Sequence, residues 1–286
     1  MSEKTVQSSD HASGDIDPGT PAAGRRVTVI TGASGGIGAD LARVFARRGH
    51  DVFLVSRNGA ALETLAREIT MPDRPRPLVF PCDLSRPSAV QELGEELAKR
   101  NARAEILVNN AGFGLNGPVH KIDQNEQLEI IDLNVRAAAG VTLSLLPQIC
   151  AARGKILNVA SIAGYFPGGP GMAVYYASKA FLLSFSRALS QELRPMGVSV
   201  TALCPGYTKT GFQARAGIGP YDLLSRLPGA VTSMAVAEAG YAGLMAGQRE
   251  IVPGILNKLL VWSLPFLPKS VILDAISRLQ QKRAAL

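Results

Sequence analysis

Short apolar runs alternate with longer segments of helical periodicity over most of the chain. The runs at 25–31 (RRVTVIT) and 51–57 (DVFLVSR) are typical of strands, and the segment between them carries apolar residues on one helical face. This alternation recurs to about residue 204. Strands joined by crossover helices predict parallel pairing, with helices on both faces of the sheet. We therefore predict an α/β fold built on a single doubly wound parallel sheet.

The two ends of the chain depart from this pattern. Residues 1–24 are polar and rich in Ser, Asp, Gly and Pro. They predict a flexible tail, because such a stretch buries too little apolar surface to become ordered, and they lack the apolar core of a signal peptide. We assign residues 25–255 to one domain and residues 256–286 to an amphipathic extension.

The composition excludes several functional classes. The chain of 286 residues is 47% hydrophobic and 19% charged, with a formal net charge of +7 at pH 7. No basic run with interleaved aromatic residues predicts a nucleic-acid partner, and no apolar run of about 18 residues predicts a membrane span. The scattered cysteines Cys82, Cys150 and Cys204 have neither metal-ligand spacing nor a disulfide pattern. They favour a reducing, cytoplasmic location and no metal.

A glycine-rich loop joins the first predicted strand to the first predicted helix. TGASGGIG places Gly32, Gly36 and Gly38 in the spacing G-x-x-x-G-x-G. Glycines allow the backbone to turn sharply and approach a pyrophosphate, and the helix N-terminus adds free N–H groups. A plain turn is the alternative, but the position between strand and helix favours dinucleotide binding.

The end of the second predicted strand indicates which dinucleotide binds. An NAD site usually carries an acid there, but Asp51 stands at the other end of the strand. The far end holds Ser56, Arg57 and Asn58. A guanidinium would bind the 2′-phosphate of NADP(H), contributing about 1.5–3 kcal/mol. We therefore predict NADP(H); the alternative is that Arg57 is an ordinary surface residue.

Two tyrosines in AVYYASKAF compete for a chemical role. Tyr175 lies four residues before Lys179 and Tyr176 lies three before it, so both are close to the lysine on a helix. A phenol has an ordinary pKa of about 10, and a nearby ammonium lowers it by stabilising the phenolate. A Tyr–Lys pair is therefore a candidate general acid–base. Helix geometry alone leaves both tyrosines open.

Six motifs in order resemble those of the short-chain dehydrogenase/reductase family, over residues 26 to about 210. They are TGASGGIG, CDLS with Asp83, NNAG at 109–112, DLNV with Asn134, NVASIAG with Ser161 followed by YYASK, and PGYTKT at 205–210. The family spacing Tyr-x-x-x-Lys selects Tyr175 over Tyr176.

This resemblance implies a Rossmann-type oxidoreductase, as a homodimer or homotetramer, that transfers hydride between NADP(H) and a carbonyl or secondary alcohol. It implies that Tyr175 exchanges the proton, while Asn134 holds a water chain that reaches Lys179. Ser161 would hydrogen-bond the substrate oxygen. The cofactor-binding residues that we predict are Gly32, Ser34, Gly36, Ile37, Gly38, Ser56, Arg57, Asn58, Asp83, Leu84, Asn110, Ala111, Gly112, Tyr175, Lys179, Pro205, Gly206 and Thr208.

Each catalytic candidate also has a purely structural interpretation. Ser161 would cap a turn, Asn134 would bond backbone inside a helix, and Lys179 would lie on the surface. Together and in this order they favour an active site. The alternative function is a catalytically silent NADP(H)-binding sensor or scaffold on the same fold, which would be free to lose this set.

The segment after the PG motif is where the resemblance places a cover over the substrate. Residues 207–232 mix glycine and proline with apolar side chains, which predicts a mobile lid and an apolar substrate. The apolar lid residues are Phe212, Tyr221, Leu223, Leu224 and Leu227.

The extension at 256–286 has four interpretations at this stage. It would serve as a further lid, a subunit contact, a membrane-surface anchor, or a segment packed on its own domain. Its most apolar part, KLLVWSLPFLPK, is too short and too interrupted by proline to span a bilayer. A membrane surface is therefore not the favoured partner.

Overall fold

We describe residues 24–217 and 231–284 of the protein, from a computed structural model. The predicted tail, apart from Gly24, lies outside the described residues. So do four of the five predicted apolar lid residues, Tyr221, Leu223, Leu224 and Leu227.

Seven strands form one sheet in the order β3-β2-β1-β4-β5-β6-β7. All neighbouring strands pair in parallel, which confirms the predicted doubly wound architecture. The strands are β1 (Arg25–Thr31), β2 (Val52–Ser56), β3 (Leu78–Pro81), β4 (Ala102–Asn109), β5 (Lys155–Val159), β6 (Ser199–Leu203) and β7 (Glu250–Ile251).

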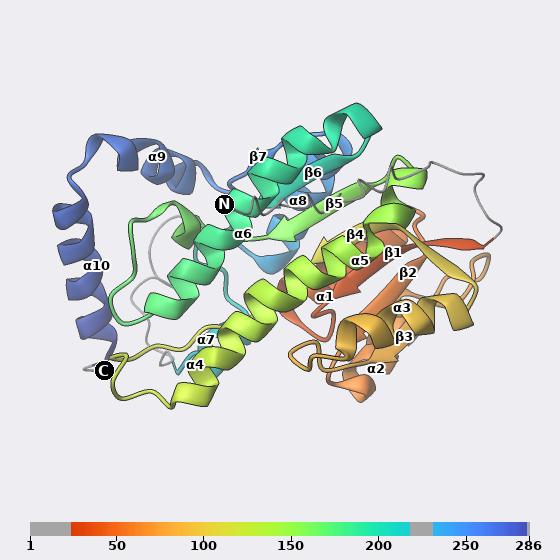
Figure 1. Cartoon of the computed structure of the whole chain (residues 1–286), viewed down its shortest axis with the longest axis horizontal. Helices are drawn as coiled ribbons and strands as arrows, with labels where there is room; N and C mark the ends of the chain where they lie inside the picture. Colours follow the sequence, from red (N-terminus) through yellow and green to blue (C-terminus); the bar gives the residue numbers. More distant parts are fainter. Residues whose placement is uncertain (1–23, 218–230, 285–286) are drawn as a thin grey trace, which may run out of the picture.

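Helices cover both faces of this sheet (Figure 1). α3, α5 and α6 pack on one face, and α1, α2 and α8 pack on the other. The helices are α1 (Gly36–Arg47), α2 (Gly59–Ile69), α3 (Ala89–Lys99), α4 (Gln124–Ile131), η1 (Asp132–Ala137), α5 (Ala138–Ala151), η2 (Ile162–Tyr165), α6 (Ala173–Glu192), η3 (Arg194–Met196), α7 (Phe212–Arg215), α8 (Ser233–Met245), α9 (Ile255–Ser263), η5 (Leu264–Phe266) and α10 (Lys269–Ala284).

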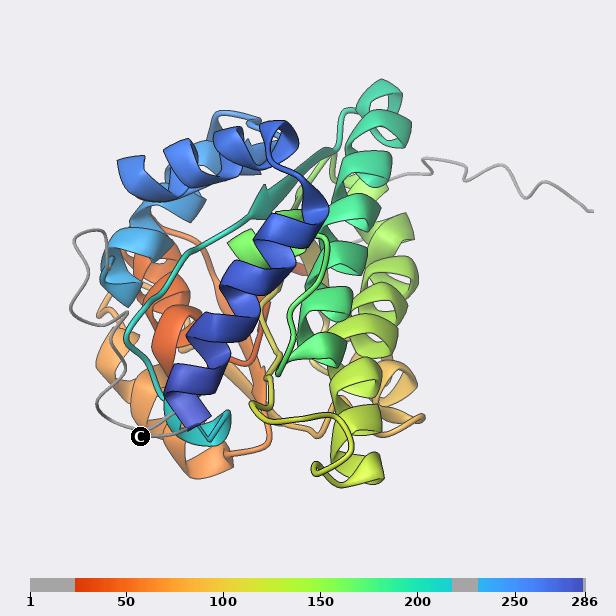
Figure 2. The same ribbon diagram turned by 90° about the vertical axis from the view of Figure 1, so that its left-hand side faces the viewer.

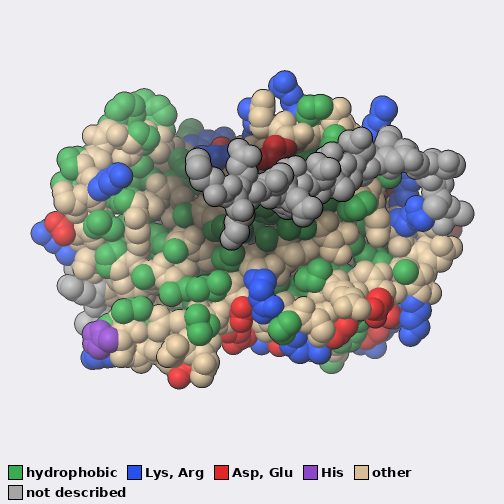
Figure 3. All heavy atoms as spheres, viewed as in Figure 1, with side chains coloured by type: hydrophobic (Ala, Val, Ile, Leu, Met, Phe, Trp, Pro, Cys, Tyr) green, Lys and Arg blue, Asp and Glu red, His purple; other side chains and the backbone are tan. Residues whose placement is uncertain are grey.

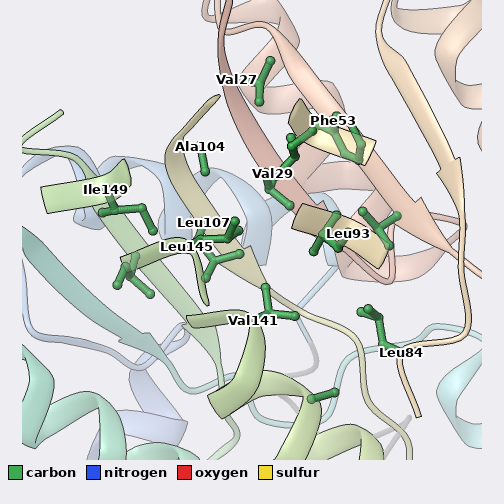
Figure 4. Packing of buried hydrophobic residues seen from close by; sticks show 14 of the residues in the cluster. Val27, Val29, Phe53, Leu84, Leu93, Ala104, Leu107, Val141, Leu145 and Ile149 are labelled. Atoms are coloured by element: carbon green, nitrogen blue, oxygen red, sulfur yellow. The ribbon is translucent and has the colours of Figure 1, made fainter. Parts of the chain in front are cut away.

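The alternation of side chains along each strand produces two hydrophobic cores. Val27 and Val29 of β1 belong to the cluster beneath α3 and α5, whereas Ile30 belongs to the cluster beneath α1 and α8. Figure 4 shows the first cluster, in which Leu107 of β4 lies among residues of α5 such as Leu145. Because both faces of the strands are buried, their sequences read as continuous apolar runs.

One long apolar helical run belongs to this core. α4, the π-helical turn η1 and α5 follow one another over residues 124–151, a run long and apolar enough by length and composition to cross a membrane. Its residues Ile130, Val141, Leu145 and Ile149 are buried in the cluster that covers the sheet. The apolar face of this run therefore serves packing within the domain.

The strand order reverses at β1. The chain runs outward from β1 to β3 and then returns to β4 on the other side of β1. In such sheets, ligands bind beyond the carboxyl ends of the strands at this switch point. The loops after β1, β2, β4, β5 and β6 hold most of the residues that we predict for the site, so these residues come from one edge of the sheet.

Candidate active site

The glycine-rich loop after β1 is folded so tightly that it admits few side chains. Gly32 has a φ of +66°, a left-handed conformation that favours glycine. A Cβ on Gly38 would overlap the carbonyl oxygen of Gly32. Gly36 lies against the side chain of Thr210, from the loop after β6, whereas no atom lies within 4 Å of the Cβ position of Gly35. The turn therefore faces open space at the start of α1, as pyrophosphate binding requires.

Asn110 holds this loop against the end of β4. Its Nδ2 donates to the carbonyl oxygens of Thr31 at 3.0 Å and Gly32 at 3.1 Å. The backbone N–H groups of Asn110 and Ala111 both donate to Thr31 Oγ1 at 3.0 Å. The Asn110 amide thus acts by positioning the loop. Ile37, half-buried at the start of α1, packs against the core.

The end of β2 supplies a hydroxyl, a guanidinium and a helix cap. Ser56 Oγ is buried and has no hydrogen-bond partner among the described residues. Arg57 is half-exposed, and its Nη1 lies 3.2 Å from Glu129 Oε1. Asn58 caps α2, its Oδ1 accepting from the backbone N–H of Ala61 at 3.0 Å. A buried hydroxyl without a partner is costly, so this position suits a polar ligand.

A second guanidinium, which the sequence analysis missed, reaches the same place. Arg215 lies on α7, and its Nη2 is 3.5 Å from Glu129 Oε1. Its guanidinium carbon is 3.9 Å from the centre of the Phe113 ring. Burial and the neighbouring Arg57 lower the pKa of Arg215. No local pattern marks Arg215, because only the fold brings it near Arg57.

Asp83 and Leu84 differ in what they present to the crevice. Asp83 Oδ1 accepts hydrogen bonds from the Ser85 hydroxyl at 2.7 Å and the Ser85 N–H at 3.0 Å. Burial alone would raise the pKa of Asp83, but these bonds outweigh it and lower the pKa. The Leu84 side chain is buried in the core beneath the sheet. Only the Leu84 backbone is therefore left to face a ligand.

Ser161, Tyr175 and Lys179 come together beyond the ends of β4 and β5. The Ser161 side chain lies next to the Tyr175 hydroxyl, where it favours the phenolate and so acts to lower the pKa of Tyr175. Lys179 Nζ lies 5.8 Å from the centre of the Tyr175 ring and donates to the Val159 carbonyl at 2.9 Å. Lys179 is only 6% exposed, which excludes the interpretation of a surface lysine. Ser161 also caps a turn, accepting from the Ala163 N–H at 3.1 Å, so it combines both interpretations.

Tyr176 turns away from this group. Its ring packs with Leu264, Ile272 and Ile276 of the C-terminal helices. It also meets Phe166 edge-to-face, with ring centres 6.1 Å apart. Of the two neighbouring tyrosines, Tyr175 is therefore the one that faces the serine after β5.

Burial dominates the ionisation of the Tyr–Lys pair. It raises the pKa of Tyr175 to about 12, against the opposing effect of the hydrogen bond with Ser161. It lowers the pKa of Lys179 to about 8. The predicted net lowering of the phenol pKa is not found in the protein alone, because burial outweighs any stabilisation of the phenolate by the ammonium. The ammonium lies over the ring face, bonds a carbonyl, and is itself poorly solvated.

Asn134 fastens the loop after β4 to α6. It is buried in the π-helical turn η1, a distortion that is frequent at functional sites. Its Nδ2 donates to the Phe113 carbonyl at 2.9 Å and to Ser178 Oγ at 3.0 Å. Its Oδ1 accepts from the Phe113 N–H at 3.1 Å. The structural interpretation expects Asn134 to bond backbone inside its own helix. Asn134 does bond backbone, but that of Phe113, which belongs to the loop after β4.

Two glycines let that loop approach the other residues closely. A Cβ on Gly112 would lie 2.8 Å from Asn134 Oδ1 and 3.6 Å from Lys179 Nζ. A Cβ on Gly114 would lie 2.8 Å from the Tyr175 ring. The loop therefore contributes backbone, not side chains, at these two positions.

The loop after β6 bounds the crevice on its other side. The Pro205 carbonyl accepts from the Ile162 N–H at 3.0 Å, which ties this loop to the loop after β5. Thr208 is buried, and its Oγ1 donates to the Gly206 carbonyl at 3.2 Å. Asn257 of α9 lies so close to Gly206 that a Cβ there would overlap its amide. The C-terminal extension therefore begins directly beside this loop.

These residues fit a dinucleotide. The open glycine turn with its exposed Ser34, the unpaired hydroxyl of Ser56 and two guanidinium groups lie along one edge of the sheet. In the described ranges, no group of three or more His, Cys, Asp or Glu residues is placed to hold a metal. Another hollow, lined by His50, Asp51 and neighbouring residues, opens at the opposite edge of the sheet.

Comparisons with known proteins agree with this geometry. A family model described as short chain dehydrogenase matches residues 26–218. Sulfoacetaldehyde reductase 2 of Chromohalobacter salexigens is 36% identical over 189 residues, or 65% of this chain and 74% of that protein. The very-long-chain 3-oxoacyl-CoA reductase of Laccaria bicolor is 38% identical over 180 residues, or 61% of this chain and 52% of that protein.

Solved structures extend the likeness. A short-chain dehydrogenase from Sphingobium yanoikuyae in complex with NADPH has a TM-score of 0.72 at 30% identity, covering 86% of this chain and 97% of that one. A 3-ketoacyl-(acyl-carrier-protein) reductase from Brucella melitensis complexed with NADH has a TM-score of 0.70 at 28% identity, covering 80% and 96%. Together with the family model, these likenesses show that the chain belongs to the short-chain dehydrogenase family and is an oxidoreductase of that type.

Proposed function

We propose that the protein is an NADP(H)-dependent reductase of apolar carbonyl compounds, working in reverse on secondary alcohols, with Tyr175 as the general acid–base. The observation that carries the proposal is the meeting of Ser161, Tyr175 and Lys179 in one crevice beside the glycine turn. Ser161 follows β5, whereas Tyr175 and Lys179 both lie on α6, one turn apart. Such convergence of a donor, an acid and a cation is what proton transfer to an oxygen requires.

The chain would hold the cofactor along the carboxyl edge of the sheet. The glycine turn would receive the pyrophosphate, and the backbone at 110–112 would line the adenine side. When bound, NADPH supplies the hydride that reduces the carbonyl carbon. The residues of the chain bind and orient the cofactor and the carbonyl substrate, and they transfer the proton to the substrate oxygen.

The proton comes from Tyr175. With a pKa of about 12, its hydroxyl carries the proton through the neutral range and is ready to donate it to a carbonyl oxygen. Ser161, whose side chain lies next to that hydroxyl, is placed to donate to the same oxygen as negative charge develops. Lys179 keeps a positive charge nearby below its pKa of about 8 and favours the resulting phenolate.

Two cations at the rim support NADP(H) over NAD(H). Arg57 and Arg215 both approach Glu129, and a 2′-phosphate would bond a guanidinium more strongly than a half-exposed carboxylate does. Ser56 Oγ, which has no hydrogen-bond partner among the described residues, offers a further donor. The solved neighbours include complexes with NADPH and with NADH, so the preference rests on these side chains.

The surroundings of Tyr175 support an apolar substrate. The Phe212 ring lies 5.3 Å from the Tyr175 ring, centre to centre. A hollow next to Tyr175 is lined mainly by apolar side chains, among them Leu115, Val119, Ile122, Ile130, Met172 and Val174.

Oxidation of NADPH against a panel of apolar ketones, aldehydes and 3-oxoacyl thioesters tests the proposal, with Tyr175→Phe beside Tyr176→Phe. We expect turnover to fall about 10²–10⁴-fold in Tyr175→Phe and to persist in Tyr176→Phe. NADPH binding, followed by the fluorescence of the bound nicotinamide, should survive both changes. Absence of turnover in the wild type despite bound NADPH would instead favour the silent sensor.

A further inference from the structure

The C-terminal helices carry a concentrated apolar surface. α9 has no buried residue, and Trp262 and Phe266 are 69% and 71% exposed. We define the C-terminal apolar patch as Ile255, Leu256, Leu259, Leu260, Trp262 and Phe266, all of them exposed. Figure 3 shows hydrophobic side chains gathered at the corner of the molecule over α9. A patch of this kind usually marks an interaction site.

The patch is held in place by the domain. Leu264, Ile272 and Ile276 are buried and pack against Tyr165, Phe166 and Tyr176. Figure 2 shows α10 running across this end of the molecule with α9 above it. The inner side of this extension therefore packs on the domain, while the apolar residues of α9 point outward.

The charges around the patch indicate what it binds. Lys258 and Lys269 are exposed within and just after it in the chain, Arg278 is exposed on α10, and Asp274 is the only acid between Val252 and Ala284. A second copy docked patch to patch would bring these cations together with few acids to pair with them, which disfavours self-association. An anionic bilayer complements both the apolar side chains and the cations.

The length of α9 decides whether it crosses a bilayer or lies in its interface. α9 has 9 residues. At about 1.5 Å per residue it is far shorter than the roughly 30 Å hydrocarbon core, so it cannot cross the bilayer. A helix with exposed Trp, Leu and Ile and flanking Lys instead lies in the interface, where Trp is favoured.

We propose that the C-terminal apolar patch docks the protein on the surface of an anionic lipid bilayer, with α9 lying in the membrane interface. Lys258 and Lys269 face the lipid headgroups, and Trp262 and Phe266 enter the acyl boundary. This docking does not depend on the proposed reductase activity. It also places α10, and with it the wall that packs on Tyr176, next to the membrane.

The single tryptophan of the chain makes the test direct, because Trp262 is the only source of indole fluorescence. The full chain is mixed with vesicles of phosphatidylcholine alone or of phosphatidylcholine with phosphatidylserine. We expect a blue shift of the emission, quenching by bromine-labelled acyl chains, and co-sedimentation with the phosphatidylserine vesicles that weakens at high salt. Failure to co-sediment, or an emission spectrum unchanged by vesicles, overturns the proposal.

Variants distinguish binding through the C-terminal apolar patch from non-specific binding to vesicles. Trp262→Ser with Phe266→Ser should lower vesicle partitioning by at least about tenfold while leaving the thermal midpoint unchanged, because both side chains are exposed. Lys258→Glu with Lys269→Glu should remove the preference for phosphatidylserine. Leu143→Ser, which changes a residue of α5 that is also 58% exposed, is the matched control and should bind as the wild type.

Two results would contradict this assignment. Equal loss of partitioning in Leu143→Ser would show that the patch is not the contact. The second result combines two observations. If the wild type does not bind vesicles, and if in sedimentation without vesicles only the Trp262→Ser, Phe266→Ser protein dissociates to a smaller species, the patch would be assigned to a second copy of the chain.

Discussion

Glu129 Oε1 lies 3.2 Å from Arg57 Nη1, so a carboxylate on α4 holds the guanidinium that follows β2. The same oxygen is 3.5 Å from Arg215 Nη2 on α7. One acid therefore links the loop after β2 to α7, in the segment after β6. If a 2′-phosphate binds there, it competes with Glu129 for the same cations.

Replacement of Arg57 by Asp should reverse the cofactor preference. The change removes a guanidinium and adds a charge that repels a phosphate, so the ratio of NADPH to NADH affinity should fall about 10- to 100-fold. Titration of both cofactors measures this ratio. Arg67→Asp, at an exposed position of α2, is the control. An unchanged ratio in Arg57→Asp would show that Arg57 does not read the cofactor.

Replacement of Glu129 by Gln should strengthen NADPH binding. Without the carboxylate, Arg57 and Arg215 lose the anion that they share, and Arg57 keeps only the longer contact with Asp83 Oδ2 at 3.9 Å. Because half-exposed ion pairs contribute only about 0.2–1 kcal/mol, we expect a gain of a few-fold for NADPH and none for NADH. Weaker NADPH binding in this variant would mean that Glu129 is needed to hold the rim in shape.

Alanine at two positions of the glycine turn should have different effects. Gly38→Ala forces a methyl group onto the Gly32 carbonyl and should abolish cofactor binding or lower the thermal midpoint. Gly35→Ala places a methyl group in open space on extended backbone and should leave folding intact. Calorimetry with and without NADPH compares them. Equal tolerance of both changes would contradict the tight turn.

Replacement of Asn134 by Ala should cost stability. It leaves the N–H and carbonyl groups of Phe113 buried without their partner, a penalty of about 2–4 kcal/mol. For a domain of this size, the thermal midpoint should fall by about 5–15 °C. Ser178→Ala removes the bond that this amide donates to Ser178 Oγ and the bond that the hydroxyl donates to the Tyr175 carbonyl, but it leaves Phe113 paired and should cost less. A change of midpoint no larger than that of Ser178→Ala would argue against this role.

The pH profile of carbonyl reduction should follow Lys179. Its pKa of about 8 means that the ammonium is present below this pH and is lost as the pH rises through it, whereas Tyr175 keeps its proton until about 12. We therefore expect kcat/KM to decline above about pH 8. Lys179→Arg, which stays charged at higher pH, should be slower but should move this decline upward. A decline at the same pH in both proteins would exclude Lys179 as its source.

Much of the site was predictable because its signals are local. Each of three signals is contained in a stretch of a few residues: the glycine spacing, the Tyr–Lys separation, and the lack of an acid after the second strand. The selection of Tyr175 over Tyr176 was different, since helix spacing allows both. The different environments of the two rings distinguish them: Tyr175 lies beside Ser161, and Tyr176 packs against α10.

The sequence by itself determined the α/β class, the boundaries of most strands and helices, and the residue types at the ends of the strands, because periodicity and turn chemistry act over short stretches of chain. Only the tertiary structure decided the meeting of Arg57, Glu129 and Arg215, the direction of the Tyr175 pKa shift, and the outward face of α9. These depend on burial and on contacts between segments far apart in the chain. Desolvation and long-range packing arise only once the chain has folded.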